Sequence, residues 1–177
     1  MTRLFAFILT LILTTGVYAM DKENTLYLDL KDGRVVIELD PAAAPKTTAR
    51  IKELARAGFY DGVVFHRVIP GFMAQTGDPT GTGMGGSGRK LPAEFNKTPH
   101  VRGTISMARA SDPNSADSQF FICFADARFL DGQYTAFGRV TSGMEFVDRI
   151  KAGTSANNGA VSNPDKIVKM QVAADAK

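Results

Sequence analysis

Hydrophobic and polar residues alternate in two neighbouring segments near the start of the chain. Every second residue is aliphatic in residues 25–30 and again in residues 35–39. A period of two is typical of a strand with one buried face. The Asp32-Gly33 pair between them is a turn signal, and Asp40-Pro41 ends the pattern. We therefore predict a β-hairpin.

Two other segments repeat their apolar residues with a helical period. Residues 45–57 begin with proline, keep their aliphatic side chains on one stripe and are followed by Gly58. This pattern predicts a helix with Gly58 as its C-terminal cap. Residues 144–151 have similar spacing with Ser142 nearby as a cap, and they predict a second helix.

The remaining apolar runs are short, and turn residues such as Pro70-Gly71 and Asp131-Gly132 separate them. They predict six further strands, at residues 62–69, 72–76, 104–108, 119–124, 136–140 and 166–172. Many short strands with two helices indicate a mainly β protein, a barrel or sandwich in which closure removes exposed sheet edges.

The first 19 residues have the layout of a secretory signal peptide. Arg3 precedes an apolar stretch at residues 4–13, and the small residues Val17 and Ala19 stand before a cleavage site. We predict cleavage after Ala19, a single domain at residues 20–177, and location in the periplasm. Full secretion is an alternative. An uncleaved anchor is another, although the apolar stretch is short for a membrane span.

The composition is that of one ordinary globular domain, with 177 residues, 44% hydrophobic and 22% charged. The formal charge is +3 and both signs are interspersed, so we expect no nucleic-acid partner. The single cysteine, Cys123, allows no internal disulfide, and its apolar neighbours predict a core position. We expect a monomer without stable membrane insertion after processing.

Two sequence patterns that could indicate a functional site do not support one here. Residues 81–86 match G-x-G-x-x-G, but the sequence after them cannot start a helix, so we interpret them as a flexible surface loop and not a phosphate site. His66, His100 and Cys123 are far apart in the sequence. Nothing therefore points to a metal site or a catalytic triad, and we expect no cofactor.

Residues 65–78 hold a more informative combination. If the two strands within this segment pair, Arg67 and Gln75 lie on one face with Phe72 and Met73 close by. On spacing alone, a surface arginine whose stem covers apolar area is the favoured interpretation.

The same segment resembles the signature of the cyclophilin family. The similarity continues through residues 103–110, 118–123, 129–132 and 137–140, in order and at family spacing. The resemblance implies a closed eight-stranded antiparallel β-barrel capped by two helices. It also implies a peptidyl-prolyl cis-trans isomerase that acts on proline-containing polypeptides, including unfolded and exported proteins, without metal or cofactor.

The resemblance also assigns site residues. Arg67 is implied as the catalytic residue, which stabilises the twisted amide by hydrogen bonds, and Gln75 as the residue that orients it. Four residues match the pocket for the proline ring: Phe72, Met73, Phe121 and Leu130. Three match the groove for the substrate backbone: Ala108, Arg109 and Gln119. His66 is implied to be structural.

Three positions depart from the best-known eukaryotic pattern. Phe129 stands where many members have Trp, Tyr134 where they have His, and Arg109 where they have Asn. Phe129 and Tyr134 resemble bacterial members, and the resemblance implies that both belong to the substrate-binding residues. The Trp position bears on cyclosporin binding in the family, so we expect weak binding here.

Two other functions compete with catalysis. A chaperone could hold unfolded segments in the same groove without isomerising them, but it would not need Arg67. A structural barrel would call for large exposed apolar stretches or adhesive repeats, which the sequence lacks.

Overall fold

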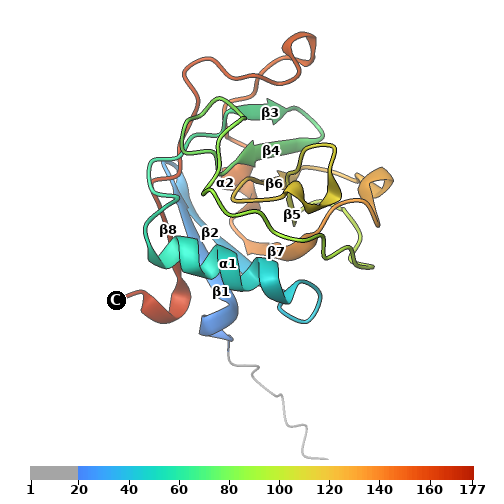
Figure 1. Cartoon of the computed structure of the whole chain (residues 1–177). Coiled ribbons are helices and arrows are strands. Elements are labelled where there is room, and N and C mark those ends of the chain that lie inside the picture. The colour runs from blue at the N-terminus through green and yellow to red at the C-terminus, as the bar shows by residue number, and fades with distance from the viewer. Residues whose placement is uncertain (1–19) are drawn as a thin grey trace, which may run out of the picture.

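The computed structural model describes residues 20–177, and its regular structure is mainly β. One antiparallel sheet has the strand order β3-β4-β6-β5-β7-β2-β1-β8 (Figure 1). The strands are β1 (Thr25–Leu30), β2 (Gly33–Leu39), β3 (Arg67–Ile69), β4 (Met73–Thr76), β5 (Thr104–Met107), β6 (Phe120–Cys123), β7 (Ala136–Ser142) and β8 (Lys169–Val172). The predicted signal peptide, residues 1–19, lies outside the described residues.

The predicted hairpin is confirmed as β1 and β2. Leu30 pairs with Gly33, so the turn is formed by Lys31 and Asp32, one residue earlier than the sequence signal indicates. Gly33 is already part of β2, where an added Cβ would collide with the ring of Phe146. Close packing therefore explains this glycine better than the turn does.

The sheet curls strongly, but the predicted closed barrel is not confirmed. The ladder ends at β3 and β8, which do not pair with each other in the described part of the chain. The segments preceding these two strands make irregular contacts instead. The N–H of Gly62 donates to the carbonyl of Ile167 at 2.8 Å, and the N–H of Ile167 donates to the carbonyl of Val63 at 2.9 Å. The strand predicted at residues 62–69 is therefore regular only in β3.

Helix α1 (Pro45–Arg56) is confirmed and ends one residue before the predicted boundary. Gly58 follows it with φ of +68°, the left-handed conformation that commonly terminates a helix. At the other end, the carboxylate of Glu94 accepts hydrogen bonds from the backbone N–H groups of Lys46 and Thr47, at 2.9 and 2.8 Å. These bonds satisfy donors that have no partner within the helix.

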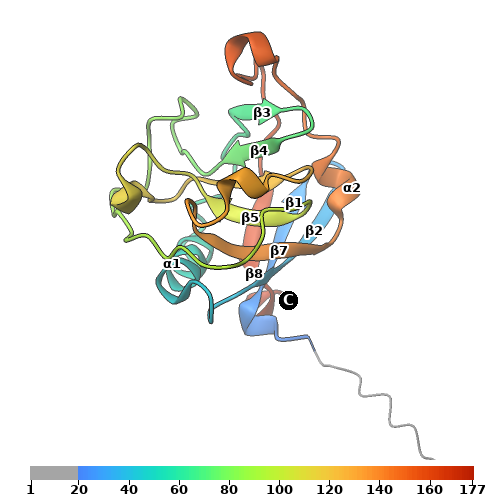
Figure 2. The ribbon, with the colours of Figure 1, turned by 90° about the vertical axis from the view of Figure 1, so that its right-hand side faces the viewer.

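Helix α2 (Met144–Val147) is a single turn, shorter than predicted. Ser142 does not cap it, because Ser142 is still paired in β7; Gly143, with φ of +84°, precedes the helix instead. After Val147 the chain continues in tight turns, in which the N–H of Ile150 donates to the carbonyl of Val147 at 3.1 Å. Figure 2 shows α1 and α2 at opposite sides of the sheet.

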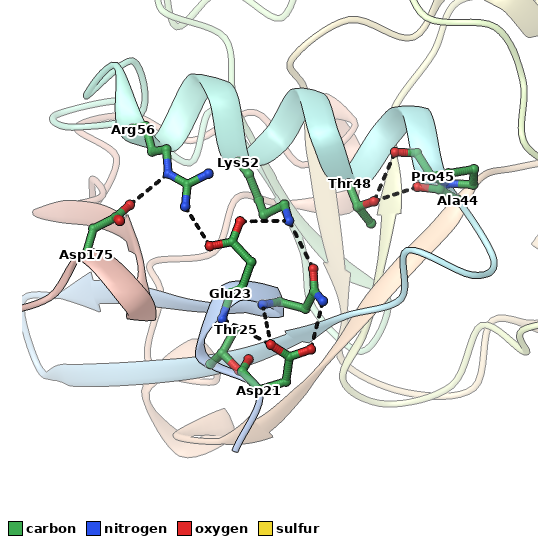
Figure 3. Close-up of polar contacts among 10 residues, drawn as sticks. Asp21, Glu23, Thr25, Ala44, Pro45, Thr48, Lys52, Arg56 and Asp175 are labelled. Atoms are coloured by element: carbon green, nitrogen blue, oxygen red, sulfur yellow. Dashed lines mark hydrogen bonds and ion pairs between the residues drawn. The ribbon is translucent and has the colours of Figure 1, made fainter. Parts of the chain in front are cut away.

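Charged side chains connect both ends of the described chain to α1 (Figure 3). Glu23 pairs with Lys52 at 3.1 Å and with Arg56 at 2.8 Å, and Arg56 also pairs with Asp175 at 2.8 Å. Asp21 caps the short 3-10 turn before β1, accepting from the N–H of Glu23 at 3.1 Å. Within residues 20–177, the hydrogen bonds of the N-terminal end thus begin at Asp21.

Candidate active site

Side chains on β3, β4 and β6 alternate between two faces of the sheet. Val68, Ala74 and Ile122 belong to the main hydrophobic core. Their neighbours along each strand face the other way, because successive side chains in a strand point to opposite faces. Arg67 of β3 and Gln75 of β4 lie directly opposite each other on this second face, as the sequence predicted.

The guanidinium of Arg67 is held by neutral oxygen atoms. Its Nη1 donates to Oε1 of Gln75 at 3.1 Å, its Nε to the carbonyl of Asn158 at 3.0 Å, and its Nη2 to Oδ1 of Asn158 at 2.9 Å. A guanidinium has five N–H donors, of which each terminal nitrogen carries two. One N–H on each terminal nitrogen is therefore left without a partner among residues 20–177. Burial lowers the pKa of Arg67, which ordinarily lies far above neutrality.

A chain of amide groups continues from Arg67. Gln75 donates from Nε2 to Oε1 of Gln119 at 2.9 Å. Gln119 in turn donates from Nε2 to the carbonyls of Gly83 and Gly85, at 3.0 and 2.8 Å. The arginine is thus linked through two glutamines to the glycine-rich loop at residues 81–86.

A small apolar cluster lies beside the guanidinium. Met73, Phe121 and Leu130 are buried in it, and Phe72 packs against them with partial exposure. Phe129 is 66% exposed, and its ring centroid lies 5.5 Å from that of Phe72 at the rim. The cluster can therefore surround a small apolar ring and leave one side open for its entry.

One cavity of about 780 Å³ joins the arginine and the cluster. All but one of the eleven site residues assigned from the sequence line it: Arg67, Phe72, Met73, Gln75, Ala108, Arg109, Phe121, Phe129, Leu130 and Tyr134. Gln119 lines the adjoining cavity and reaches the first through its bond to Gln75. The structure therefore gathers all the assigned residues around one groove.

Arg109 uses its guanidinium within the protein. Its Nε and Nη2 donate to the carbonyl of Gln133 at 3.0 and 2.9 Å, and its Nη1 donates to the carbonyls of Ala110 and Ser111 at 2.9 and 3.2 Å. The same group lies 4.6 Å from the ring centroid of Tyr134. Arg109 thus braces the groove wall, and most of its donors are already occupied.

Asn158 is a site residue that the sequence reasoning missed. Its φ of +57° is left-handed, a conformation that asparagine tolerates better than most residues. The segment around it runs beside β3, where Val68 donates its N–H to the carbonyl of Gly159 at 2.8 Å. The Asn157-Asn158-Gly159 run was the available signal of a left-handed turn.

The glycine-rich loop at residues 81–86 lies at the surface, but it is anchored. The carboxylate of Asp78 accepts hydrogen bonds from the N–H groups of Gly83 at 2.6 Å and Gly85 at 3.1 Å. The loop is therefore attached to a buried anion, a contact that the interpretation as a flexible surface loop did not include.

His66 lines the cavity and is only 9% exposed. Neither ring nitrogen has a hydrogen-bonding partner among the described residues. Burial lowers the pKa of His66, and the negative charge of Asp78 offsets this only in part. The ring is therefore neutral at neutral pH.

Two further properties concern the described residues as a whole. No three side chains of the types His, Cys, Asp and Glu gather there in a way that could hold a metal ion. Residues 20–177 also contain no helix that is both long and apolar enough to cross a bilayer.

Comparison with known proteins identifies the family and the fold of the chain. Residues 25–172 match the family described as cyclophilin type peptidyl-prolyl cis-trans isomerase/CLD. A probable peptidyl-prolyl cis-trans isomerase of Brucella suis is 58% identical over 171 residues, which cover 90% of this chain and 87% of that protein. Peptidyl-prolyl cis-trans isomerase B of Bacillus subtilis is 47% identical over 133 residues, which cover 73% of this chain and 92% of the relative.

Solved structures agree. A cyclophilin from Hirschia baltica superposes with a TM-score of 0.79 at 28% identity, covering 89% of this chain and 76% of that one. A cyclophilin type isomerase of Cryptosporidium parvum, solved in the presence of the dipeptide Ala-Pro, gives 0.76 at 30% identity, covering 84% and 98%. The architecture is thus that of the cyclophilin fold. The chain belongs to the cyclophilin-type peptidyl-prolyl cis-trans isomerases and is an enzyme of that class.

The buried, unpartnered ring of His66 predicts a loss of stability in mild acid. Because its pKa is lower in the folded state, the unfolded chain binds the proton more readily, so stability falls as the pH drops below about 6.5. His66→Phe keeps a ring but removes the titration. We expect the melting temperature of this variant to depend less on pH between 7 and 5 than that of the unchanged protein. Parallel curves in a thermal-melt series would contradict this explanation.

Proposed function

We propose that the groove isomerises X–Pro peptide bonds by stabilising the twisted amide without covalent chemistry, with Arg67 as the catalytic residue. Rotation about a peptide bond is slow because resonance gives it a barrier of about 18–20 kcal/mol. At the top of this barrier conjugation is lost, and the proline nitrogen gains a basic lone pair. A catalyst must therefore offer a donor to that nitrogen in the twisted state.

The observation that carries the proposal is the arrangement of donors on Arg67. Three are used to orient the guanidinium, and one N–H remains on each terminal nitrogen, beside the apolar cluster. These two can reach the proline nitrogen and its carbonyl oxygen together. The group stays charged at any working pH, whereas lysine would supply a point charge without the planar fork.

The apolar cluster is suited to the proline ring, which has no N–H and loses no hydrogen bond on burial. Met73, Phe121 and Leu130 would surround the ring, and Phe72 and Phe129 would cover its open side. A bound ring also excludes water from Arg67, which strengthens the bond made in the transition state. A ring held in the pocket also fixes the proline side of the X–Pro bond while the other side rotates.

The free energies involved show how much of the barrier lowering Arg67 can supply. A barrier lower by about 6 kcal/mol speeds rotation roughly 10⁴-fold. One charge-assisted hydrogen bond contributes about 1.5–3 kcal/mol. Arg67 therefore cannot supply the whole effect through one bond, and ring burial with backbone positioning must provide the rest.

We further propose that the substrates are proline-containing segments of unfolded and exported proteins, bound by a monomer. The similar isomerase of Cryptosporidium parvum, solved in the presence of Ala-Pro, supports the choice of ligand. The predicted signal peptide supports the choice of compartment, the periplasm.

The proposed mechanism predicts that Arg67→Ala abolishes most catalysis and spares the fold. The side chain lies at a groove and leaves no core cavity, so the melting temperature should change little. Loss of a preorganised donor should lower kcat by about 10²–10³-fold, with a smaller effect on peptide affinity. Arg67→Lys should also be poor. Isomerisation rates measured by NMR exchange on X–Pro peptides test this.

Phe121→Ala is the matched comparison, because it should weaken peptide binding as well as rate and should also cost about 3 kcal/mol or more of stability. Near-normal isomerisation by a well-folded Arg67→Ala protein would overturn the mechanism. It would favour a chaperone that holds unfolded segments in the groove.

Because position 129 is phenylalanine, we expect cyclosporin to inhibit the enzyme weakly. We expect the Phe129→Trp variant to be inhibited more strongly. The exposed ring at the rim would gain an indole N–H donor and more apolar area. Inhibition constants for the two proteins, with their uninhibited rates as a control, provide the measurement. Equal affinity for cyclosporin would remove this role of position 129.

Export predicts that the mature protein begins at Met20. Cleavage after Ala19 leaves intact the contacts of Asp21 and Glu23 that attach the N-terminal end to the domain. N-terminal sequencing of the exported protein tests this, and Ala19→Asp should remain uncut because the site needs a small residue. A chain that starts at Met1 in a membrane fraction would contradict the proposal.

A further inference from the structure

A buried carboxylate lies behind the site without touching the groove. Asp78 is 0% exposed. Its Oδ1 accepts from the N–H and the hydroxyl of Thr80 at 2.7 and 2.8 Å, and its Oδ2 accepts from the N–H groups of Gly83 and Gly85 at 2.6 and 3.1 Å. The catalytic arrangement proposed above does not use this anion.

The glycine-rich loop is built around Asp78. A Cβ added at Gly85 would collide with Oδ1 of Asp78, so glycine is required there. Gly83 has φ of +84°, which glycine adopts without strain. Backbone N–H groups that converge on one point form an anion-binding concavity. Here the anion is the protein's own carboxylate.

The loop also sets the polarity of the amide chain. Backbone carbonyl oxygens only accept hydrogen bonds. The two bonds to Gly83 and Gly85 must therefore come from the NH₂ group of Gln119, which turns its oxygen toward Gln75. Gln75 must then donate to Gln119 and present its own oxygen to Arg67. Each amide has one orientation that satisfies every contact.

We propose that Asp78 is a positioning residue for the isomerase reaction, which fixes the glycine-rich loop and thereby orients Arg67 through Gln119 and Gln75. The inference rests on the proposed catalytic role of Arg67. Asp78 does not touch the substrate. It holds the two carbonyls at which the amide chain ends, and without them both glutamines could reverse their amide groups.

The charge state of Asp78 is compatible with this role. Burial opposes its ionisation, but the hydrogen bonds from Thr80, Gly85 and Gly83 prevail and hold the pKa of Asp78 at about 2. The carboxylate is therefore an acceptor at both oxygens at any pH where the enzyme works.

Asp78→Asn tests the proposal with a nearly isosteric change. One acceptor oxygen becomes a donor that faces N–H groups, so the loop must shift. In the protein comprising residues 20–177 we expect kcat on a neutral X–Pro peptide to fall about tenfold, with KM changed less than about twofold because the ring pocket is untouched. An unchanged kcat in a folded variant would overturn the proposal.

A double-mutant cycle separates this role from a general structural one. Gln119→Leu breaks the amide chain, so adding Asp78→Asn to it should lower kcat no further. Losses that multiply would mean that Asp78 acts by another route and would refute the inference. Asp117→Asn is the matched control, since Asp117 holds the segment directly after this loop through the N–H groups of Ser87 and Gly88. It should leave kcat within about twofold, and a loss equal to that of Asp78→Asn would also refute the inference.

A spectroscopic readout makes the test independent of activity. The Nε–H resonance of Arg67, assigned by its absence in Arg67→Lys, should shift in Asp78→Asn and not in Asp117→Asn. A resonance that stays in place would contradict the inference even if Arg67 is catalytic, whereas an active Arg67→Ala would contradict the proposed function itself. If Asp78→Asn does not fold, Thr80→Val removes one bond to the carboxylate and should shift the resonance in the same direction.

Discussion

The alternation of side chains along paired strands is the constraint on which the site depends. Burial of Ala74 and Ile122 in the main core fixes which face of β4 and β6 points inward. Met73, Gln75 and Phe121 must then share the opposite face. A slip of one residue in the register would exchange the two sets completely. The energy that packs the core is therefore also what brings the amide and the apolar pocket together on the outside of the sheet.

Much of this arrangement is encoded locally and could be predicted from the sequence. Strand periodicity located the hairpin and the pairing of β3 with β4, because two short strands separated by Pro70-Gly71 have few alternatives. That pairing alone puts Arg67 beside Gln75. The apolar pocket is different, since Phe121 and Leu130 come from segments some fifty residues away. The local hydrophobic pattern could not place these two residues in the pocket. Only the similarity to cyclophilins placed them there.

The remaining features depend on contacts that a sequence pattern does not contain. Helix α2 is shorter than predicted because the chain enters tight turns after Val147. The barrel is not closed by a regular strand pair, because the segments before the edge strands β3 and β8 meet irregularly. The sequence shows that Arg109 is charged but not where its side chain points. In the structure, its N–H groups donate to backbone carbonyls of the groove wall. Asn158 binds Arg67 from ninety residues further along, a distance at which spacing carries no information.

The choice of neutral partners around Arg67 has an energetic reason. Gln75 and Asn158 align the guanidinium through oxygen dipoles and leave its full charge in place. A carboxylate at either position would align it equally well, but two opposite unit charges about 4 Å apart attract by about 4 kcal/mol at an effective dielectric constant of 20. That is comparable with the barrier lowering of about 6 kcal/mol considered for the proposed mechanism. In that mechanism, a carboxylate would compete with the proline nitrogen for the same cation. Asp78 does not compete in this way, because its carboxylate accepts hydrogen bonds from N–H groups of the loop and does not touch Arg67. In the inference above, it affects only the orientation of Arg67, through the uncharged amides of Gln119 and Gln75.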